Sequence, residues 1–353
     1  MELELKASIR VMVVDDSPLM CKVLTNILNS DPQIIVVGVA HNGKEAVEIV
    51  SYLKPDIITM DIHMPVMDGL EATKQIMASY PIPILVVSTS VFKVGMSKVF
   101  KAISYGAMDV ITKGDMEITE DRGAGVELLE KIKFLSNLKV IKQPLGKAEK
   151  EKKEKAAVLQ ISKKKALDRV VAIVASTGGP QVILEIIKSF PQDFPCGIVV
   201  VQHIAEGFVE GLVDWLNAEC QMKVKVAADS EEIASGVVYI APSGLQFRVE
   251  EDRRIHLFNE PAYNGHRPSG DVLLESVAKA YREKAIAIIL TGMGGDGALG
   301  MKVVKQLGGR TIAQDEKSCI VFGMPKVAIQ MGVIDDVLPV EKIAEEVAKS
   351  LED

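Results

Sequence analysis

Short apolar runs alternate with helix-period segments twice along this 353-residue chain, and that repetition constrains its fold more than any other feature. In the first third of the chain, amphipathic helical segments separate strands predicted at 10–14, 34–39, 56–60, 84–87 and 109–111. Strands that alternate with helices predict a parallel sheet covered on both faces. Residues 1–135 are therefore expected to form a doubly wound α/β domain, flavodoxin-like, with five parallel strands.

A second alternating pattern begins near Arg169, and its middle part differs from the first. Its main strands are predicted at 170–174, 197–201, 223–226, 286–290 and 310–313. Three short segments, 237–240, 246–249 and 254–258, have the pattern of hairpin strands. We expect residues 166–353 to form a second doubly wound domain, a Rossmann-like parallel sheet with an antiparallel hairpin insertion.

The composition changes abruptly between the two patterns. Residues 137–165 contain ten lysines and three glutamates, with only scattered Leu, Ile and Val. Such a segment buries too little apolar surface to offset its chain entropy, which predicts a charged linker at 136–165. A lysine run is also found in nucleic-acid and membrane-surface patches, but this one lacks interleaved aromatic residues. With a formal net charge of −7 as well, we expect no nucleic-acid partner.

Cysteine usage and hydropathy indicate a cytoplasmic protein. The four cysteines lie far apart without a CxxC pair, which favours thiols in a reducing compartment over a disulfide or zinc framework. No apolar run approaches the roughly 18 to 20 residues that cross a bilayer, and residues 1–10 lack the apolar stretch of a secretory signal. We expect a monomer that is not inserted in a membrane.

Polar groups follow four predicted strands of the first domain. Asp15 and Asp16 end the first strand and Asp61 ends the third, while Ser88 and Lys113 end two others. The carboxyl ends of neighbouring parallel strands meet at one edge, and carboxylates that are close together need a cation. Oxygen ligands suit Mg²⁺. A carboxylate nucleophile, a metal, a hydroxyl and an ammonium suffice to bind and accept a phosphoryl group.

These residues, together with Asp-Ile-His-Met-Pro-Val-Met-Asp-Gly-Leu at 61–70, resemble a response-regulator receiver domain over about residues 8–135. The resemblance implies that Asp61 accepts a phosphoryl group from a histidine kinase. It implies that Ser88 is the switch hydroxyl and Lys113 the phosphate-sensing cation. The metal site implied for Mg²⁺ consists of Asp15, Asp16, Asp61 and the carbonyl group of His63.

Strands of the second domain also lead into reactive residues. Ser176 precedes Thr-Gly-Gly-Pro, His203 follows the next strand, and Asp296 lies in a glycine-rich turn. If the strands are parallel, a hydroxyl, an imidazole and a carboxylate share one crevice. An imidazole that takes the hydroxyl proton, oriented by a carboxylate, makes serine a nucleophile for acyl transfer. Backbone N–H groups near Met293 or at the following helix start are candidates for an oxyanion site.

Two alternatives compete for the same region. Gly-Met-Gly-Gly-Asp-Gly at 292–297 matches the GxGxxG dinucleotide fingerprint, with Asp315 or Glu316 about twenty residues further on, and predicts hydride transfer. This alternative explains neither the Ser-Thr-Gly-Gly turn nor His203.

A second Ser/His/Asp set is formed by His266, Ser269 and Asp271. Ser269 is better explained as the cap of the following helix. His266 and Arg267 are candidates to line the cleft.

Five segments of the second domain resemble the bacterial chemotaxis protein-glutamate methylesterase (CheB) family: 176–180, 201–203, 266–269, 290–297 and 313–316. With the receiver and linker, the resemblance spans nearly the whole chain. It implies that Ser176 is the nucleophile, His203 the general base and Asp296 the orienting acid. It also implies that Thr177 and the Met293 backbone assist at the oxyanion. Ile-Ala-Glu at 204–206 departs from the usual methionine and proline of the family.

The resemblance implies a phosphorylation-activated enzyme that hydrolyses glutamate γ-methyl esters on methyl-accepting chemoreceptors and releases methanol, for chemotactic adaptation. It also implies deamidation of receptor glutamines. Mg²⁺ is implied for the receiver and no cofactor for the esterase. The competing hypothesis is a response regulator whose hydrolase-like domain serves as a receptor-docking scaffold, or acts on a partner outside chemotaxis.

Overall fold

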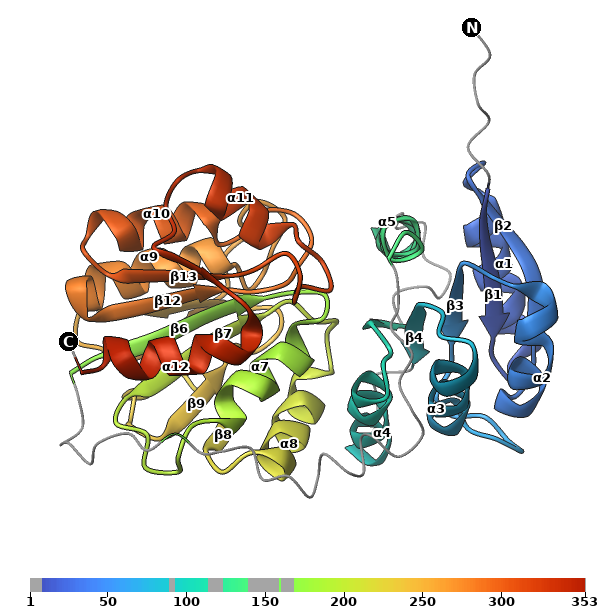
Figure 1. Ribbon diagram of the computed structural model, residues 1–353, viewed down its shortest axis with the longest axis horizontal. Helices are drawn as coiled ribbons and strands as arrows, with labels where there is room; N and C mark the ends of the chain where they lie inside the picture. The colour runs from blue at the N-terminus through green and yellow to red at the C-terminus, as the bar shows by residue number, and fades with distance from the viewer. Residues whose placement is uncertain (1–7, 89–92, 114–122, 139–158, 160–167, 353) are drawn as a thin grey trace, which may run out of the picture. The chain divides into compact units, whose positions relative to one another are not determined.

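The computed structural model describes residues 8–88, 93–113, 123–138, 159 and 168–352, and the chain divides into two compact units (Figure 1). Unit 1 is Met1–Glu154 and unit 2 is Lys155–Asp353. The linker limits of 136–165 stay a prediction, because most of that segment lies outside the described residues. No helix in the described part of the chain is both long enough and apolar enough to cross a membrane.

Unit 1 is built on one five-stranded parallel sheet in the order β2-β1-β3-β4-β5. Helix α1 contacts α5, and α3 contacts both α2 and α4, so helices form a layer on each face. This arrangement confirms the flavodoxin-like fold. The elements are β1 (Ile9–Val14), α1 (Pro18–Asn29), β2 (Ile34–Ala40), α2 (Gly43–Leu53), β3 (Ile57–Met60), α3 (Gly69–Ser79), β4 (Ile84–Ser88), α4 (Lys93–Ser104), β5 (Asp109–Thr112) and α5 (Gly123–Leu135).

Strands β3, β4 and β5 of unit 1 are mostly apolar because helices cover both faces of the sheet. Every residue of β3, β4 and β5 is buried. Helix α1 begins directly after the polar end of β1. The Ser17 hydroxyl accepts a hydrogen bond from Met20 N, and Pro18 occupies the first helical position. The turn between β1 and α1 therefore keeps the preceding carboxylates at the edge of the sheet.

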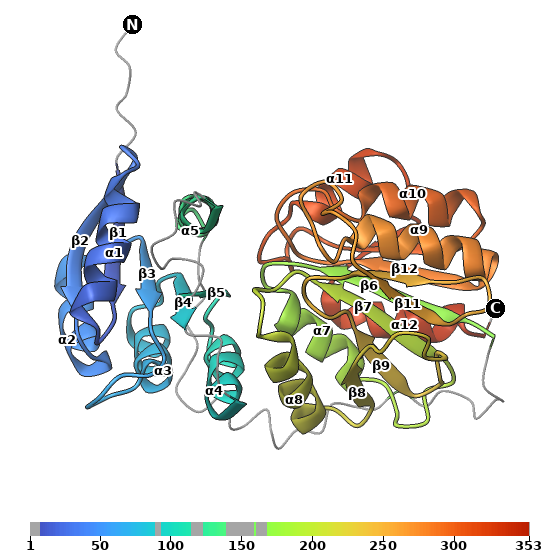
Figure 2. The ribbon, with the colours of Figure 1, turned by 180° about the vertical axis from the view of Figure 1, so that it is seen from behind.

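Unit 2 contains a seven-stranded parallel sheet in the order β14-β13-β12-β6-β7-β9-β8. Helix α7 contacts both α8 and α12 on one face, and α10 contacts both α9 and α11 on the other (Figure 2). The elements are β6 (Val170–Ala175), α7 (Gly179–Lys188), β7 (Gly197–Gln202), α8 (Val209–Glu219), β8 (Lys223–Val226), β9 (Val237–Ile240), β10 (Gln246–Val249), β11 (Ile255–Phe258), α9 (Gly270–Tyr281), η2 (Arg282–Lys284), β12 (Ala285–Ile289), α10 (Ala298–Gln306), β13 (Arg310–Gln314), α11 (Met324–Gln330), β14 (Asp336–Leu338) and α12 (Val340–Ser350).

The hairpin insertion is confirmed, but with two strands. Strands β10 and β11 pair antiparallel as a separate sheet that packs on α9. The third segment predicted as a hairpin strand, Val237–Ile240, is instead β9, which pairs in parallel with β7 and β8 inside the main sheet. Its near-complete burial fits that position, since a strand covered on both faces has no polar side.

Candidate functional site

In unit 1, an ammonium group lies between two carboxylates at the carboxyl ends of β1 and β3. The Lys113 ammonium is 2.7 Å from Asp15 Oδ2 and 2.9 Å from Asp61 Oδ2, and all three side chains are buried. Burial alone would lower the pKa of Lys113, but Asp61 and Asp15 raise it above its usual value. Burial raises the pKa of Asp61, Lys113 opposes that shift, and the charge of Asp15 adds to it. One ammonium therefore leaves this acidic cluster under-compensated.

The donor set of this pocket fits a hard divalent cation. Carboxylate oxygens of Asp15, Asp16 and Asp61 all lie within 4.8 Å of one another, and Asp16 is exposed to solvent. Oxygen donors with access to water are what Mg²⁺ prefers. His63 N lies 3.4 Å from Asp61 Oδ1, which places residue 63 beside the pocket, while the role of its carbonyl group stays a prediction.

The hydroxyl group of Ser88 at the end of β4 completes the predicted receiver set. Its side chain is 1% exposed, and its Oγ has no hydrogen-bond partner in the part of the chain that is described. Lys113 N donates to Ser88 O at 2.9 Å, so the two strand ends carrying these residues are joined. A buried hydroxyl without a partner is costly unless a ligand uses it at some stage.

In unit 2, the turns that follow β6 and β7 are held side by side. Ala175 pairs with Gln202 in the parallel register, and His203 N donates to Ala175 O at 2.9 Å. Ser176 N donates to Thr291 O at 3.0 Å, which ties the same turn to the segment after β12. The three predicted loops therefore meet at one edge of the sheet, as expected for strands in the order β12-β6-β7.

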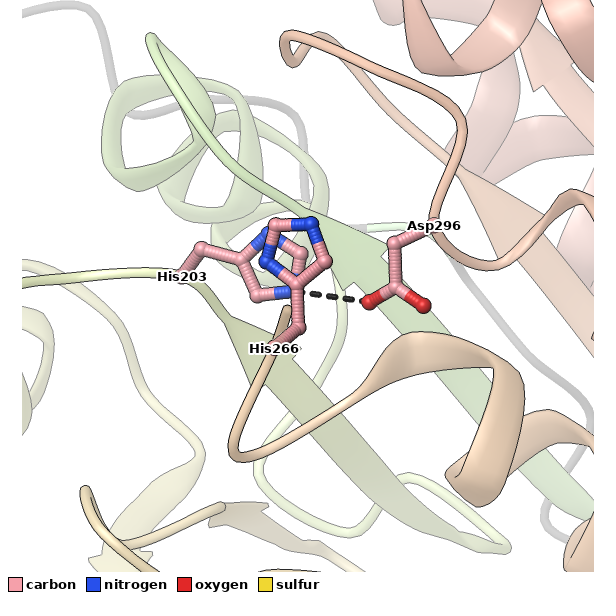
Figure 3. Close-up of side chains that lie close together, drawn as sticks. All are labelled: His203, His266 and Asp296. Carbon is pink, nitrogen blue, oxygen red and sulfur yellow. Dashed lines mark hydrogen bonds and ion pairs between the residues drawn. The ribbon is translucent and has the colours of Figure 1, made fainter. Parts of the chain in front are cut away.

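His203 and Asp296 are in direct contact (Figure 3). His203 Nε2 is 2.8 Å from Asp296 Oδ2. The other ring nitrogen, Nδ1, is buried and has no hydrogen-bond partner among the described residues. Ser176 is partly buried on the neighbouring turn, and no hydrogen bond from its hydroxyl to His203 is present within the described ranges. The structure thus joins two of the three predicted residues directly and places the third beside them.

Asp296 is surrounded by donors. Its carboxylate accepts from Ser269 Oγ at 2.8 Å, Gly270 N at 2.6 Å and Asp271 N at 3.1 Å, in addition to His203. Burial would raise the pKa of Asp296, but the hydrogen bond and charge of His203, with the donors from Gly270 and Ser269, lower it to about 2. The carboxylate is therefore ionised and fixed in orientation.

Gln202 is a functional candidate that the sequence did not single out. Its side chain is 3% exposed, and its Nε2 donates to both Ser176 O and His203 O at 2.8 Å. A side chain at Gly179 would not fit beside it, because a Cβ there would lie 2.0 Å from Gln202 Oε1. Only the position of Gln202, directly before His203, could have indicated this bridging role.

The turn that carries Met293 is fixed from two sides. The Gly292 carbonyl accepts from Gly323 N at 3.2 Å and Met324 N at 3.0 Å. A Cβ on Gly292 would lie 2.7 Å from Ser176 Cβ, so the turn approaches the serine closely. Thr177 is buried, and its carbonyl accepts from Thr291 Oγ1 at 2.9 Å. Thr177 follows Ser176 directly, and Met293 follows the glycine that approaches Ser176, while the oxyanion roles of both residues stay predictions.

His266 lies over the ring of His203. The two ring centroids are 4.3 Å apart and the ring planes differ by 6° (Figure 3). Burial and the neighbouring His203 lower the pKa of His266, against the opposing charge of Asp296. Donor atoms of both histidines and Asp296 lie within 4.8 Å of one another. The in-plane lone pairs of parallel rings do not converge on one point, so this arrangement does not form a metal site without a ring rotation.

The two competing interpretations of this region are not supported by the geometry. Asp271 Oδ1 accepts from Gly300 N at 2.9 Å, so a carboxylate already fills the helix start that a dinucleotide pyrophosphate would use. The same bond turns Asp271 towards α10, whereas Ser269 turns towards Asp296. The set His266, Ser269 and Asp271 is therefore not a triad.

Comparison with known proteins agrees with this assembly. The family model described as CheB methylesterase matches residues 171–347, and the one described as response regulator receiver domain matches residues 11–122. The chain is similar to the protein-glutamate methylesterase/protein-glutamine glutaminase of Halalkalibacterium halodurans, with 40% identity over 98% of this chain and 99% of that protein. The corresponding protein 1 of Syntrophus aciditrophicus is 41% identical over 97% of this chain and 98% of its own length.

A solved structure, that of the Thermotoga maritima CheB methylesterase catalytic domain, is 42% identical and covers 51% of this chain and 97% of its own, with a TM-score of 0.49. The methylesterase model alone matches half of the chain, and the relatives align over almost all of it. This chain therefore belongs to the CheB methylesterase family and carries a response-regulator receiver domain ahead of the methylesterase domain.

Proposed function

We propose that this protein is a phosphorylation-activated, serine-type esterase that hydrolyses glutamate γ-methyl esters on chemoreceptors and releases methanol for chemotactic adaptation. The family membership supports the activity, and the names of the relatives support both ester hydrolysis and glutamine deamidation. The observation that carries the mechanism is the direct contact of His203 Nε2 with a buried, multiply bonded Asp296 carboxylate beside Ser176.

The proposed reaction begins with the Ser176 hydroxyl, which attacks the ester carbonyl while His203 takes its proton. Backbone N–H groups near Met293 or after Ser176 stabilise the oxyanion. His203 then returns the proton to the departing methoxide, which leaves as methanol. In the second half, His203 takes a proton from water and the hydroxide attacks the acyl carbonyl. His203 then gives the proton to Ser176 Oγ as the acyl C–O bond breaks, which releases the glutamate and restores the Ser176 hydroxyl.

The imidazole has the reverse orientation of the usual serine-protease triad. In that triad the carboxylate holds Nδ1 and the serine faces Nε2. Here Asp296 holds Nε2 and Nδ1 is the nitrogen without a partner. We therefore assign proton transfer with Ser176 to Nδ1 of His203.

Regulation is assigned to the acidic pocket of unit 1. Asp61 accepts the phosphoryl group, Lys113 binds its oxygens, and the Ser88 hydroxyl donates to it. Asp15, Asp16 and Asp61 would hold Mg²⁺, which supplies positive charge against the incoming phosphoryl oxygens. Cytoplasmic location and a histidine kinase as phosphodonor follow from the same proposal.

The test is methanol release from methylated cytoplasmic fragments of chemoreceptors, measured with and without acetyl phosphate. Wild-type protein is expected to release methanol, faster after phosphorylation, whereas Ser176→Ala should lower the rate by about 10⁴-fold. Fluorescence of Trp215, the single tryptophan, reports whether unit 2 of the variant is folded. If the folded wild type binds the fragments without releasing methanol, the docking-scaffold hypothesis replaces the esterase.

A further inference from the structure

The hydroxyl group of Ser269 does not cap its own helix. Ser269 is the N-cap residue of α9, but its side chain makes no capping hydrogen bond. Instead, Ser269 Oγ donates to Asp296 Oδ1 at 2.8 Å, and the residue is fully buried. The prediction from sequence was thus right about where the helix begins and wrong about the partner of the hydroxyl.

The carboxylate of Asp296 takes the place of the missing cap. It accepts the first amides of α9, from Gly270 at 2.6 Å and Asp271 at 3.1 Å. An anion at a helix N-terminus is stabilised by these unpaired N–H groups and by the helix dipole. Ser269 and the start of α9 therefore hold both oxygens of the carboxylate that contacts His203.

A carboxylate at the start of each of the helices α9 and α10 accepts a hydrogen bond from a backbone N–H group of the other helix. Asp296, in the turn before α10, binds the start of α9, and Asp271, in the first turn of α9, accepts from Gly300 N in α10 at 2.9 Å. Close packing allows these two hydrogen bonds, since a Cβ on Gly300 would lie 2.6 Å from Leu274 Cβ. Neither helix start can move without disturbing the other.

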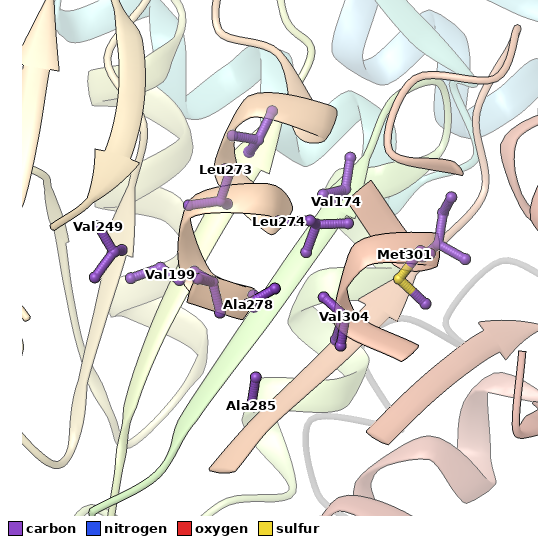
Figure 4. Close-up of a cluster of buried hydrophobic side chains, with 14 of the residues drawn as sticks. Val174, Val199, Val249, Leu273, Leu274, Ala278, Ala285, Met301 and Val304 are labelled. Carbon is purple, nitrogen blue, oxygen red and sulfur yellow. The ribbon is translucent and has the colours of Figure 1, made fainter. Parts of the chain in front are cut away.

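A hydrophobic cluster fixes α9 and α10 against the sheet. Leu273 and Leu274 of α9 are fully buried in the same cluster as Met301 and Val304 of α10, and Val174 of β6 lies between sheet and helices (Figure 4). A fully buried leucine is packed on all sides and does not shift without a cost. The residues that donate to Asp296 therefore lie at the start of a helix that is held firmly against the sheet.

The residues before Ser269 are also fixed. Gln246 of β10 is 1% exposed, donates through Nε2 to His266 O at 3.1 Å, and accepts at Oε1 from Ser269 N at 3.0 Å. Asn264 and Gly265 have φ values of 49° and 87°, and Tyr263 and His266 exchange backbone hydrogen bonds around them. This Asn-Gly turn presents the His266 ring to His203 at a centroid distance of 4.3 Å.

We propose that the segment from His266 to Asp271 positions the proposed catalytic pair, with Ser269 as the positioning residue for Asp296 and His266 as the positioning residue for the ring of His203. This inference rests on the proposed function. The hydrogen bonds of Ser269, Gly270 and Asp271 hold the carboxylate, and the stacked ring blocks rotation of the imidazole away from it. Neither side chain transfers a proton in this proposal.

The first experiment compares Ser269→Ala with Ser269→Thr and with Ser276→Ala in the full-length protein. Ser276 lies on the same helix, and its hydroxyl accepts from Val249 N at 3.0 Å without touching Asp296. We expect Ser269→Ala to lower kcat for methanol release by about 10- to 100-fold with KM changed by less than about twofold. Ser269→Thr, which keeps the hydroxyl, should recover most of kcat, and Ser276→Ala should leave it unchanged.

A second readout does not depend on turnover. The His203 Nε2 proton, bonded to a carboxylate, should give a downfield NMR resonance in the wild type that is shifted or lost in Ser269→Ala and retained in Ser276→Ala. If the wild type releases no methanol, the proposed function fails while this resonance still tests the positioning. An unaltered resonance and kcat in a folded Ser269→Ala protein would overturn the role of Ser269.

The arm that concerns His266 uses a matched ring. His266→Phe keeps a flat ring over His203 and should retain kcat within about threefold, whereas His266→Ala should lower it by about tenfold. Equal losses in both variants would overturn the positioning role of His266, because they would show that its nitrogen atoms are needed.

Discussion

Asp61 of unit 1 and Asp296 of unit 2 both lie at the carboxyl edge of a parallel sheet, and their surroundings are opposite. Asp61 shares one lysine ammonium with a second buried carboxylate, and its pKa is raised. Asp296 has donors from a hydroxyl, two amides and an imidazole, and its pKa is lowered to about 2. Asp61 therefore has too little positive charge around it, whereas Asp296 has a hydrogen-bond donor for each of its oxygens.

This contrast follows from what each carboxylate has to do in the proposed function. A carboxylate that must bind a cation and accept a phosphoryl group benefits from excess negative charge around it, because that charge attracts the cation. It also benefits from a lysine counter-ion whose long side chain can move to the phosphoryl oxygens. A residue that must orient an imidazole benefits from donors that do not move, because reorganisation during the reaction costs rate. In the proposed function, the same edge of the same kind of sheet therefore carries a switch in one unit and a preorganised site in the other.

The largest effect is expected from Asp296→Asn. The amide would turn a donor towards a site already filled with donors, and His203 would lose its orientation, so kcat should fall by about 10³- to 10⁴-fold. Asp271→Asn is the matched control, because its amide oxygen can still accept from Gly300 N, and a loss below about tenfold is expected. Similar losses in methanol-release assays of the two variants would remove the distinction drawn for Asp296.

The receiver pocket should respond most to Lys113→Met. Removing the ammonium leaves Asp15 and Asp61 buried without a counter-charge, so the free energy of unfolding of unit 1 should fall by about 3 kcal/mol. Mg²⁺ should restore more stability to this variant than to the wild type, as calorimetry with and without the cation would show. Lys98→Met, which breaks a partly buried pair with Asp68, should cost less than Lys113→Met, because both side chains of this pair still reach solvent.

The contribution of Asp296 to the free energy of unfolding of unit 2 should decrease at acidic pH. Because the folded-state pKa of Asp296 is lowered to about 2, its contribution to stability is complete above the unfolded-state value and is lost as pH falls through the folded-state value. The stability advantage of wild type over Asp296→Asn should therefore shrink by about 2 kcal/mol between pH 6 and pH 2. Urea unfolding followed by Trp215 fluorescence measures this difference, and a constant advantage would contradict the assignment.

The smallest expected effect has the opposite sign. Because the folded-state pKa of Asp61 is raised, its ionisation at neutral pH opposes folding, and Asp61→Asn should raise the calorimetric midpoint of unit 1 at pH 7. Asp68→Asn, at a half-exposed carboxylate whose pKa is lowered despite its partial burial, should not stabilise the unit. A lower calorimetric midpoint for Asp61→Asn would contradict this prediction, because it would show that Lys113 fully compensates the charge of Asp61 in the folded state.

The sequence was most informative where polar residues follow apolar strands. Parallel strand ends must meet at one edge, so the proximity of Asp15, Asp61 and Lys113, and of Ser176, His203 and Asp296, could be predicted from order alone. The predicted strand limits differ from the observed ones by a residue or two. The assignment of Val237–Ile240 as a hairpin strand was wrong. A strand buried on both faces lacks the alternation of apolar and polar residues from which its place in the fold could be predicted.

The second layer of the site could not be predicted in the same way. The partner of the Ser269 hydroxyl, the double hydrogen bond of Gln202 and the stacking of His266 on His203 depend on side-chain directions after the chain has folded. A serine before a helix is most often a cap, and that general preference gave the wrong partner here. The short strand Asp336–Leu338 and the helix Met324–Gln330 also lacked a clear period, being too brief to show one.

The orientation of the His203 ring determines where an electrophile would attach. With Nε2 engaged by Asp296, the lone pair that remains is on Nδ1, the nitrogen to which we assign proton transfer with Ser176. A haloketone or alkyl halide delivered by an ester-like reagent should therefore leave its carbon on Nδ1 and yield the π-substituted histidine, whereas enzymes with the common triad yield the τ isomer. The two isomers separate by chromatography after hydrolysis, so chemical labelling alone would show which imidazole nitrogen of His203 is open to an electrophile.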